Sequence, residues 1–573
     1  MQPSSDQPSS GGSSRSMRRY GPIIAIVVVI AVVGGIVLVS GGGDDEEGGD
    51  DTTAVTESAG EGALSFSAAE EQGVEVDWPD TCDTERGTVA IPNYFAPECY
   101  AWFEDGEQVT DGDNGGATDV GVTADTITIA YYQSPPNPIS DYLLGGFGID
   151  DTNEDALDTI QTYVDLFNEY YETYGRTVEV VQVEGSGPPN DDVAARADAV
   201  RIDEEIGAFM VWGGPILTDA FADELAARQI PCIGCQIGEP DAFSQERAPY
   251  IISIGQSTNQ AREHVVEWLS KQVAGRPAEF ADGPLEGEDR VFGTLFLESD
   301  EDGAEQNAIT LDRLAEEGVE VAESVAYQLD PARLQEQAAS AIARFKEAGV
   351  TSIIFSGDPI APGTFTPEAT NQDYFPEWII TGSALVDTTV AARGFDQEQW
   401  ANAFGISPLA ARVDPTESGS FYLHTWYTGE PPAADGSSGV ILPLPQVFFA
   451  ALQGVGPDLT RENWANALFE APATPDAISQ ASLNWGDDTE WEGTDFNGLD
   501  NWTQIWWDPD ATGIDETREE GQGMYTYVDG GARYRIGEWP EEDTRAFDPE
   551  GAVAFYETAP DGEEPPDYPS PAG

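Results

Sequence analysis

The fold is decided by three consecutive stretches: TITIAYY at residues 126–132, EDALDTIQTYVDLFNEYYETY at 154–174 and TVEVVQV at 177–183. The first and third stretches have the β-branched and aromatic composition of strands. The second has apolar residues at helical spacing, and Gly175 follows it as a predicted C-cap. A strand, a helix and a second strand in this order predict a βαβ unit with parallel strands.

The same alternation continues along the chain and then begins again. In the first block we predict further strands at 208–212, 230–233 and 250–254 and helices at 191–205, 219–228 and 260–272. In the second block we predict strands at 290–297, 319–327, 351–355 and 378–380 and helices at 303–317 and 332–348, with Pro331 at the start of the latter. Two such blocks predict an α/β protein with two doubly wound, Rossmann-like lobes and largely parallel sheets.

The charge of the chain excludes one class of partner. Lys and Arg number 24 and Asp and Glu number 106, which gives a formal net charge of −82. A surface this negative repels phosphate backbones, so we expect no nucleic-acid binding. It also disfavours docking on anionic lipid through basic patches. Hydrophobic residues make up 40% of the chain, which is enough for packed cores.

An uncharged run near the N-terminus predicts a membrane anchor. Residues 21–40 (GPIIAIVVVIAVVGGIVLVS) carry no charge, arginines precede the run and acidic residues follow it. A helix of this length spans a bilayer, and the arginines place the body of the protein outside the cytoplasm. The alternative is a cleaved signal peptide. We favour a single-pass anchor in the cell membrane because the run is long and Leu38-Val39-Ser40 is a poor cleavage site.

The four cysteines agree with export. They form two pairs that are close in sequence, Cys82 with Cys99 and Cys232 with Cys235, and an even count outside the cell predicts disulfides. Cys232-Ile-Gly-Cys235 could instead be a redox pair, but such a motif opens a helix, whereas this one follows a predicted strand. We therefore expect a structural clip.

The order of elements over about residues 120–470 resembles the type I periplasmic substrate-binding proteins of ABC transporters, in the branched-chain amino-acid-binding group. The stretches that carry the resemblance are GVTADTITI at 121–129, MVWGGP at 210–215, RQIPCI at 228–233, YIISI at 250–254 and FKEAGVTSIIFSG at 345–357. The resemblance implies two lobes joined by hinge strands, with a solute caught between them. It implies a monomeric, extracytoplasmic protein that has no enzymatic activity and no cofactor and delivers its solute to an ABC permease.

The ligand site of such a fold is expected beyond the carboxyl ends of the strands, where glycines and helix N-termini offer free N–H groups. The lobe-one candidates are Tyr131, Tyr132, Gln133, Ser134, Trp212, Gly213, Gly214, Gly234 and Gln236. The lobe-two candidates are Glu298, Ser299, Asp300, Ser356, Gly357, Asp358, Gly382 and Ser383. Each aromatic residue among them could instead be core packing, and each glycine a plain turn.

The chain departs from the amino-acid binders of the group at two places. Where they carry small hydroxyl residues after lobe-one strands, this chain has Trp212-Gly-Gly-Pro215 and Cys232-Ile-Gly-Cys235. A cleft lined by Trp, Tyr and carboxylates suits a cationic or partly apolar ligand. Among small-molecule solutes (an amino acid, an amine or similar), these departures favour a cationic or partly apolar one over a standard amino acid.

One acidic loop resembles a calcium-binding loop. In residues 508–519, oxygen-bearing side chains stand at Asp508, Asp510, Thr512 and Glu519, with Gly513 at position 6 of the loop. The spacing is close to an EF-hand, although Thr512 replaces the usual Asp or Asn. Because the loop follows a strand-like segment, a plain β-turn is the favoured alternative.

Other function classes have weaker support. A nucleophilic hydrolase would need a base, and neither histidine, His264 nor His424, accompanies a G-x-S-x-G motif. An extracellular enzyme is therefore a minor alternative. The runner-up is a ligand-binding ectodomain of a sensory system with the same fold, and the third option is an adhesion or scaffold protein.

The sequence thus divides into seven parts. We expect a cytoplasmic disordered tail at 1–20, the transmembrane anchor at 21–40, an acidic linker at 41–62, an extension with the Cys82/Cys99 loop at 63–123, lobe one at 124–256 with about 410–475, lobe two at 257–409 with about 476–550, and an acidic, Pro-rich tail at 551–573.

Overall fold

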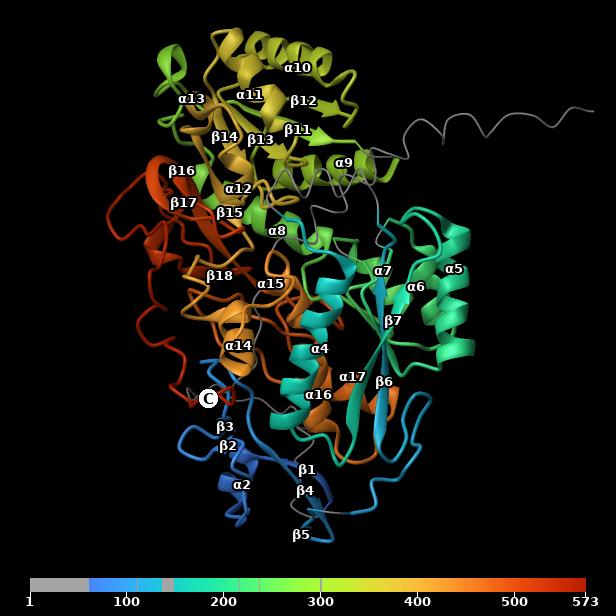
Figure 1. Ribbon diagram of the computed structural model, residues 1–573. Coiled ribbons are helices and arrows are strands. Elements are labelled where there is room, and N and C mark those ends of the chain that lie inside the picture. Colours follow the sequence, from blue (N-terminus) through green and yellow to red (C-terminus); the bar gives the residue numbers. More distant parts are fainter. Residues whose placement is uncertain (1–60, 111, 137–148, 216, 237, 299–300) are drawn as a thin grey trace, which may run out of the picture.

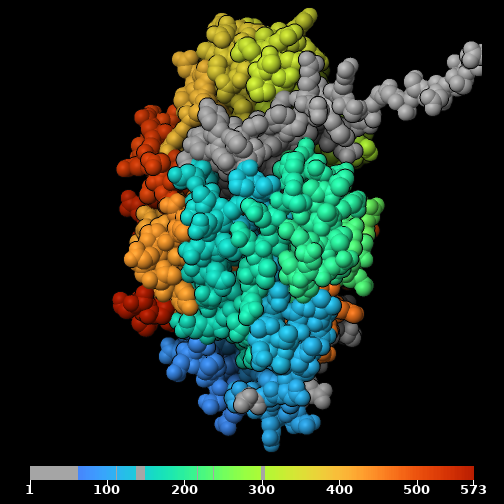
Figure 2. Space-filling model, turned by 45° about the vertical axis from the view of Figure 1, so that its right-hand side comes forward, coloured from blue at the N-terminus to red at the C-terminus, as the bar shows by residue number. Residues whose placement is uncertain are grey.

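The computed structural model describes residues 61–573 apart from 111, 137–148, 216, 237 and 299–300. Two α/β units lie one above the other, with the N-terminal extension below the first (Figure 1 and Figure 2). The predicted anchor at 21–40 lies outside the described residues, as does the acidic linker up to residue 60. Glu61 and Gly62, expected at the end of the linker, begin strand β1.

The first unit is built on a five-stranded parallel sheet in the order β10-β9-β8-β6-β7. Its strands are β6 (Thr126–Gln133), β7 (Thr177–Glu184), β8 (Met210–Trp212), β9 (Cys232–Ile233) and β10 (Ile251–Ile252). Its helices are α4 (Asn153–Tyr170), α5 (Asp192–Arg201), η1 (Ile202–Ile206), α6 (Ala220–Ala227) and α7 (Asp241–Glu246). The strand order reverses beside β6, as in doubly wound folds.

Alternating side chains of β6 enter two different cores. Ile127, Ile129 and Tyr131 pack in one core with residues of α4, whereas Ala130 and Tyr132 pack in another with residues of α5 and α6. A strand with apolar residues on both faces must be covered on both sides. The first unit is therefore a three-layer α/β/α arrangement, as the alternation of strands and helices predicts.

The second unit continues a parallel sheet into an antiparallel one, in the order β12-β11-β13-β14-β15-β16-β17, with β18 paired to β16. Its strands are β11 (Phe292–Leu297), β12 (Val321–Tyr327), β13 (Ser352–Ser356), β14 (Glu377–Ile380), β15 (Ala403–Ser407), β16 (Asn501–Ile514), β17 (Glu520–Tyr527) and β18 (Arg533–Arg535). Its helices are α8 (Thr258–Trp268), η2 (Leu269–Val273), η3 (Gly283–Leu285), α9 (Glu301–Glu316), α10 (Leu334–Ala348), α11 (Pro362–Asn371), α12 (Thr389–Ala392), α13 (Gln397–Trp400) and η4 (Val528–Gly530).

The chain passes between the two units three times. After β10 it enters α8 of the second unit, and after β15 it returns to the first unit as α14 (Gly419–Thr428), α15 (Ser438–Ile441), α16 (Pro443–Val455) and α17 (Arg461–Phe469). It then re-enters the second unit as β16. The first and third passages run side by side, because the Ser253 N–H donates to the Phe496 carbonyl at 2.9 Å and the Gly498 N–H donates to the Ser253 carbonyl at 3.0 Å.

Within the described residues, one helical stretch, Ser438–Val455, has the length and apolar composition of a membrane span. It is 67% buried in the protein, and its Phe448 and Phe449 belong to the core of the first unit. The stretch therefore consists of the helices α15 and α16, which are largely buried in the protein.

The N-terminal extension is a small layer that packs on the first unit through Val89, Ile91 and Ala96. Its elements are β1 (Glu61–Ser65), α2 (Phe66–Gln72), β2 (Cys82–Asp83), β3 (Thr88–Val89), β4 (Tyr100–Glu104) and β5 (Glu107–Gln108). Disulfides join Cys82 to Cys99 within the extension and Cys232 to Cys235 in the first unit, which are the two predicted pairings.

Two predicted helix ends are wrong. Helix α4 ends at Tyr170 and not before Gly175, because Tyr171 adopts an extended conformation that turns its ring towards Phe449, 6.0 Å away between centroids. Helix α10 begins at Leu334, so Pro331 is not its first residue. Pro331 lies instead in a turn in which the Asp330 carbonyl accepts the N–H of Leu334 at 2.8 Å.

A buried ion pair fastens the start of the second sheet. The Arg290 guanidinium donates to the Glu377 carboxylate at 2.7 and 2.8 Å, and the two side chains are 2% and 0% exposed. Glu377 also accepts from the hydroxyl of Ser352 and the N–H of Phe280, and Arg290 also donates to the carbonyl of Val273. The pair thus ties β14 to β13 and to the end of η2.

A second buried carboxyl lacks a cationic partner. Asp387 follows β14, is 5% exposed and accepts a hydrogen bond from the hydroxyl of Ser407 at the end of β15. Burial raises the pKa of Asp387 to about 6, and the charge of Glu516 adds to this shift.

We predict that Glu377→Gln lowers the free energy of unfolding by about 3–5 kcal/mol, because it leaves the Arg290 charge buried without its counter-ion. Urea unfolding at pH 7 measures the change. Glu279→Gln is the matched control, since Glu279 is exposed. Equal stability of the two variants would contradict the role assigned to the pair.

We predict that Asp387 makes stability fall as the pH rises. An unfolded Asp loses its proton near pH ~3.9, whereas the folded protein keeps the proton on Asp387 until about pH 6. The folded state therefore binds more protons between these values, and the unfolding free energy decreases across this window by up to about 3 kcal/mol. Asp387→Asn stays neutral and should lack this decrease, whereas the exposed control Asp312→Asn should retain it. Unfolding measured at pH 4 and pH 8 tests the difference, and equal decreases in both variants would refute it.

Candidate functional site

The strand registers bring the predicted site residues to one edge of each sheet. In the first unit Tyr131 lies opposite Trp212, and Trp212 lies opposite Ile233. In the second unit Phe296 lies opposite Ser356, and Phe355 lies opposite Ile380. Because the strands are parallel, the segments that follow them leave each sheet at the same edge.

At the edge of the first unit, the side chains after β6 are held by internal contacts. The Tyr132 hydroxyl donates to Asp198 at 3.3 Å, and its ring lies 4.9 Å from that of Phe221. Tyr131 is 8% exposed, and burial raises its pKa to about 12. The Gln133 amide donates to the carbonyl of Asn153 at 2.8 Å.

Ser134 is the least enclosed residue of this segment. It is half-buried, and its carbonyl accepts from the Asn153 side chain at 3.0 Å. Asn153 begins helix α4, so the helix N-terminus fixes the end of β6 through Gln133 and Ser134. Backbone groups and the Ser134 hydroxyl are what this segment can offer a ligand.

The segments after β8 and β9 are also closely packed. The Trp212 ring is fully buried, 5.6 Å from Phe448, and therefore belongs to the core. Gly213 and Gly234 both have φ +74°, which favours glycine. The Gln236 amide is buried and donates to the Thr218 carbonyl at 3.0 Å.

The Cys232–Cys235 disulfide closes the turn that contains Gly234. Both cysteines are buried, and a Cβ on Gly214 would approach the backbone of Cys235 to 3.2 Å. No redox-active helix opens at Cys232, because strand β9 occupies Cys232–Ile233. The pair is a clip that closes the turn after β9, and this turn packs against Gly214 of the turn after β8.

At the edge of the second unit, Asp358 is an internal support and not a surface group. It is fully buried and accepts from the Tyr327 hydroxyl at 2.5 Å and from the N–H groups of Ile360 and Ala361 at 2.8 and 3.0 Å. Burial raises the pKa of Asp358. Gly357 is required beside it, because a Cβ there would overlap the Tyr327 hydroxyl.

Three hydroxyl groups gather at the ends of β13 and β14, and we call Ser356, Thr381 and Ser383 the hydroxyl cluster. The Ser356 and Thr381 hydroxyls are 3.2 Å apart. The Ser383 hydroxyl accepts the Gly357 N–H at 3.0 Å and donates to the Gly357 carbonyl at 3.1 Å. Ser356 is exposed and Ser383 half-buried, so the cluster can exchange these bonds for bonds to a ligand.

The backbone after Ser383 is strained. Ala384 and Leu385 have φ +40° and +65°, a region that non-glycine residues enter rarely. Such residues cost roughly 1–3 kcal/mol each and gather at ligand-binding segments. Thr381 and this strained turn were not among the predicted site residues. The one feature of the sequence that could have indicated Thr381 is its position directly before Gly382, which was among the predicted residues.

Glu298 directly follows β11 at the same edge and is half-buried. Its N–H donates to the Tyr327 carbonyl at 2.9 Å, which fixes its backbone beside β12. Ser299 and Asp300, the next two predicted site residues, lie outside the described residues.

The acidic loop at 508–519 is a hairpin and not an EF-hand. Asp508, Asp510 and Thr512 lie in strand β16, where Thr512 pairs with Gln522 of β17, and Glu519 stands in the connecting turn. Asp508 accepts the N–H of Asp510 at 2.9 Å. In the part of the chain that the structure describes, no group of three or more His, Cys, Asp or Glu side chains is placed to hold a metal ion. The segment therefore has the strand-turn-strand geometry of the favoured alternative.

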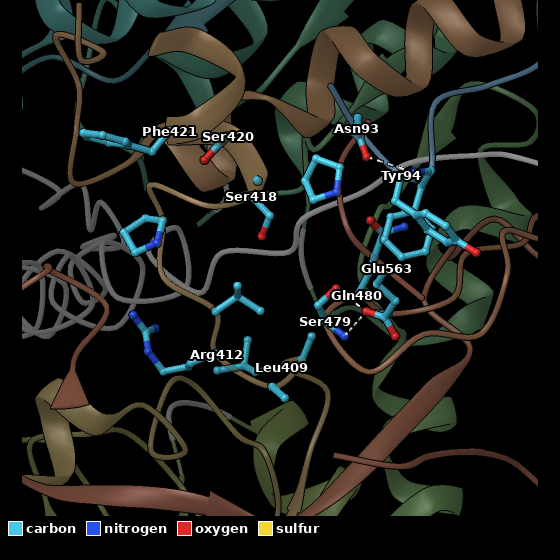
Figure 3. A pocket seen from close by; sticks show the side chains of 18 of the residues that line it. Asn93, Tyr94, Leu409, Arg412, Ser418, Ser420, Phe421, Ser479, Gln480 and Glu563 are labelled. Atoms are coloured by element: carbon cyan, nitrogen blue, oxygen red, sulfur yellow. Dashed lines mark hydrogen bonds between the residues drawn. The ribbon is translucent and has the colours of Figure 1, made fainter. Parts of the chain in front are cut away.

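Two hollows of the surface lie away from the predicted residues. One, of about 180 Å³, is formed by the second passage between the units, the extension and the last segment of the chain (Figure 3). Its polar lining includes Ser418, Ser479 and Glu563. Another, of about 330 Å³, is lined by Asp241, Glu263, Trp491 and Asp495 among others. Neither is lined by a residue of the two strand edges.

Comparison with known proteins identifies the family to which this chain belongs. The sequence profile of the periplasmic binding protein family matches residues 142–488, more than half of the chain. No relative was found among curated proteins.

Solved structures with a similar course of the chain include three substrate-binding proteins of transporters. They are an ABC transporter solute-binding protein from R. palustris in complex with 4-hydroxybenzoate (13% identity, 73% of this chain and 98% of that chain, TM-score 0.47), a fatty acid ABC transporter substrate-binding protein from Thermomonospora curvata (15%, 74% and 96%, 0.46) and a branched-chain amino acid transporter substrate binding protein from Streptococcus pneumoniae in complex with isoleucine (12%, 70% and 100%, 0.46). The ligands named are those of these proteins.

The family profile confirms the resemblance that the order of elements had predicted. It covers residues 142–488, which include most of both α/β units and the helices that return to the first, but neither β6 nor β16, β17 and β18. The chain therefore belongs to the periplasmic binding protein family.

Proposed function

We propose that this protein captures a small solute between its two α/β units outside the cytoplasmic membrane and delivers it to an ABC permease. The observation that carries the proposal is the hydroxyl cluster of Ser356, Thr381 and Ser383 at the carboxyl ends of β13 and β14. Ligands of open α/β sheets bind at this edge. The hydroxyls both donate and accept, so they can hold either a carboxylate or a neutral polar group.

The proposed solute is an amino acid or a related amine. Glu298 follows β11, the strand paired with β13 beside the hydroxyl cluster, and offers a carboxylate for an ammonium group. The cluster offers donors for a carboxylate or hydroxyl. The aromatic side chains that first suggested an aromatic-lined cleft, Tyr131 and Trp212, are packed in the core and are left out of this proposal. Specificity then depends on Glu298 and the hydroxyls.

Capture is proposed to work by hinge closure. The first lobe comprises residues 124–256 with about 410–475, the second comprises 257–409 with about 476–550, and the three passages between the units act as the hinge. A solute that contacts both strand edges binds the closed arrangement better than the open one and so shifts the population towards closure. The strained turn at Ala384 and Leu385 supports a binding role for the second edge.

The protein is proposed to stay attached to the membrane. Proteins of this family act outside the cytoplasm. The uncharged run at 21–40, with arginines before it and acidic residues after it, supports a single-pass anchor that holds the lobes on the outer side. The acidic, glycine-rich linker that follows would keep the lobes away from the lipid.

We predict that Ser383→Ala weakens solute binding about fivefold, because it removes one hydrogen bond worth ~1 kcal/mol. The probe is the amino acid or amine that raises the melting temperature most in a thermal-shift screen, and calorimetry measures its affinity. Ser340→Ala, an exposed serine on α10, is the matched control and should bind as wild type does. Stabilisation by anionic solutes alone would contradict the proposed ligand class.

We predict that protein extracted from the membrane fraction retains residues 1–40. The intact mass should match the full sequence, because Leu38-Val39-Ser40 is a poor cleavage site. A soluble protein whose mass lacks the first ~40 residues would instead establish a cleaved signal peptide.

A further inference from the structure

The segment Val553–Ser570, which we call the strap, runs along one side of the molecule across both α/β units. In Figure 1 the red chain descends from β17 to the N-terminal extension, where the end of the chain is marked. Hydrogen bonds to five parts of the protein fix its course: the second unit, the second and third passages between the units, the first unit and the N-terminal extension.

The strap begins on the second unit. The Val553 N–H donates to the Tyr527 carbonyl at 3.1 Å, and the Tyr527 N–H donates to the Val553 carbonyl at 2.8 Å. Tyr527 is the last residue of β17. These two bonds extend the second sheet by one residue of the strap.

The strap next contacts the second passage between the units, residues 408–418, which joins β15 to α14. The Tyr556 N–H donates to the Arg412 carbonyl at 2.8 Å, and the Asp414 N–H donates to the Tyr556 carbonyl at 2.9 Å. Tyr556 and Val413 thus form a β-bridge within the hinge itself. Any rotation of the passage moves the strap with it.

Glu563 then clamps the approach to the third passage. Its carboxylate accepts the N–H groups of Ile478 and Ser479 at 2.8 and 3.0 Å, and the Ser479 hydroxyl as well (Figure 3). The Ile478 carbonyl in turn accepts the Ala411 N–H of the second passage at 3.0 Å. The Glu563 carboxylate therefore holds residues 478–479, which are themselves bonded to the second passage.

The strap ends on the first unit and on the extension. The Trp426 indole of α14 donates to the Tyr568 carbonyl at 3.0 Å, and the Ser570 hydroxyl donates to the Trp426 carbonyl. The Tyr568 hydroxyl donates to Asp83, beside the Cys82–Cys99 disulfide. The same short segment is thus bonded to both units.

We propose that the strap is a restraint on the hinge, which holds the two units at the angle seen here and must yield when that angle changes. This inference rests on the lobe movement proposed above. The three covalent passages already fix which units are joined, whereas the strap adds non-covalent contacts on both sides of the hinge. Its bonds to the passages at Arg412 and Ser479 make it sensitive to hinge rotation.

The test compares Glu563→Ala with Glu557→Ala in the full-length protein. Glu557 is a glutamate of the same strap that faces solvent, so it is the matched control. Removing a charged hydrogen-bond partner should speed hydrogen exchange at the distant strap amides of Val553 and Tyr556 by about tenfold or more. Tyr568→Phe, which removes the bond to Asp83, is a milder second variant.

The angle between the units is measured with spin labels on cysteines at Val193 on α5 and Glu336 on α10, two exposed positions on the two units. The distance distribution should widen in Glu563→Ala and stay unchanged in Glu557→Ala. Unchanged distances in Glu563→Ala, despite faster exchange of the strap, would overturn the proposal.

The two proposals fail separately in this experiment. If solute shifts the distance in wild type but Glu563→Ala matches wild type in its absence, the strap is refuted and solute capture stands. If Glu563→Ala widens the distribution while no solute shifts it, the strap is supported and capture by hinge closure is refuted.

Discussion

When parallel strands are joined by helices, the segments that follow the strands all leave the sheet at the same edge. This constraint organises the molecule. In the first unit it brings together the segments after β6, β8 and β9, and in the second those after β11, β13 and β14. The two edges differ in what they offer. The first presents backbone, glycines and a disulfide clip, whereas the second presents hydroxyls, Glu298 and a strained turn. The second edge is therefore the better equipped to recognise polar groups of a solute.

The passages between the units set how the edges can approach each other. The chain crosses three times, and hydrogen bonds hold the crossings together at Ser253 with Phe496 and at Ala411 with Ile478. The strap adds contacts to both units and to two of the crossings. A hinge of this kind bends as one body, since its segments share hydrogen bonds. In the proposed mechanism, solute binding and attachment of the strap both act on the angle between the two units.

The fold could be predicted from the sequence because its signals are periodic and local. Apolar residues at 126–132 alternate between two cores, and the order of strands and helices predicted the family that the sequence profile confirms. Side-chain roles at the site could not be predicted in the same way. Trp212 packs against Phe448, which is more than two hundred residues away in the sequence. No local sequence pattern predicts that contact. Thr381 lies beside Ser356 only because of the register in which β14 pairs with β13, which the sequence does not reveal.

The central claim is that a solute touches both strand edges at once. Hydrogen exchange measured with and without the amino acid or amine that most stabilises the protein tests this claim directly. The account predicts slower exchange in two places together, the segment after β6 around Gln133 and Ser134 and the segments after β13 and β14 around Gly357 and Ser383. Protection of one edge alone, or protection confined to the hollow beside Ser418 and Glu563, would contradict capture between the two units.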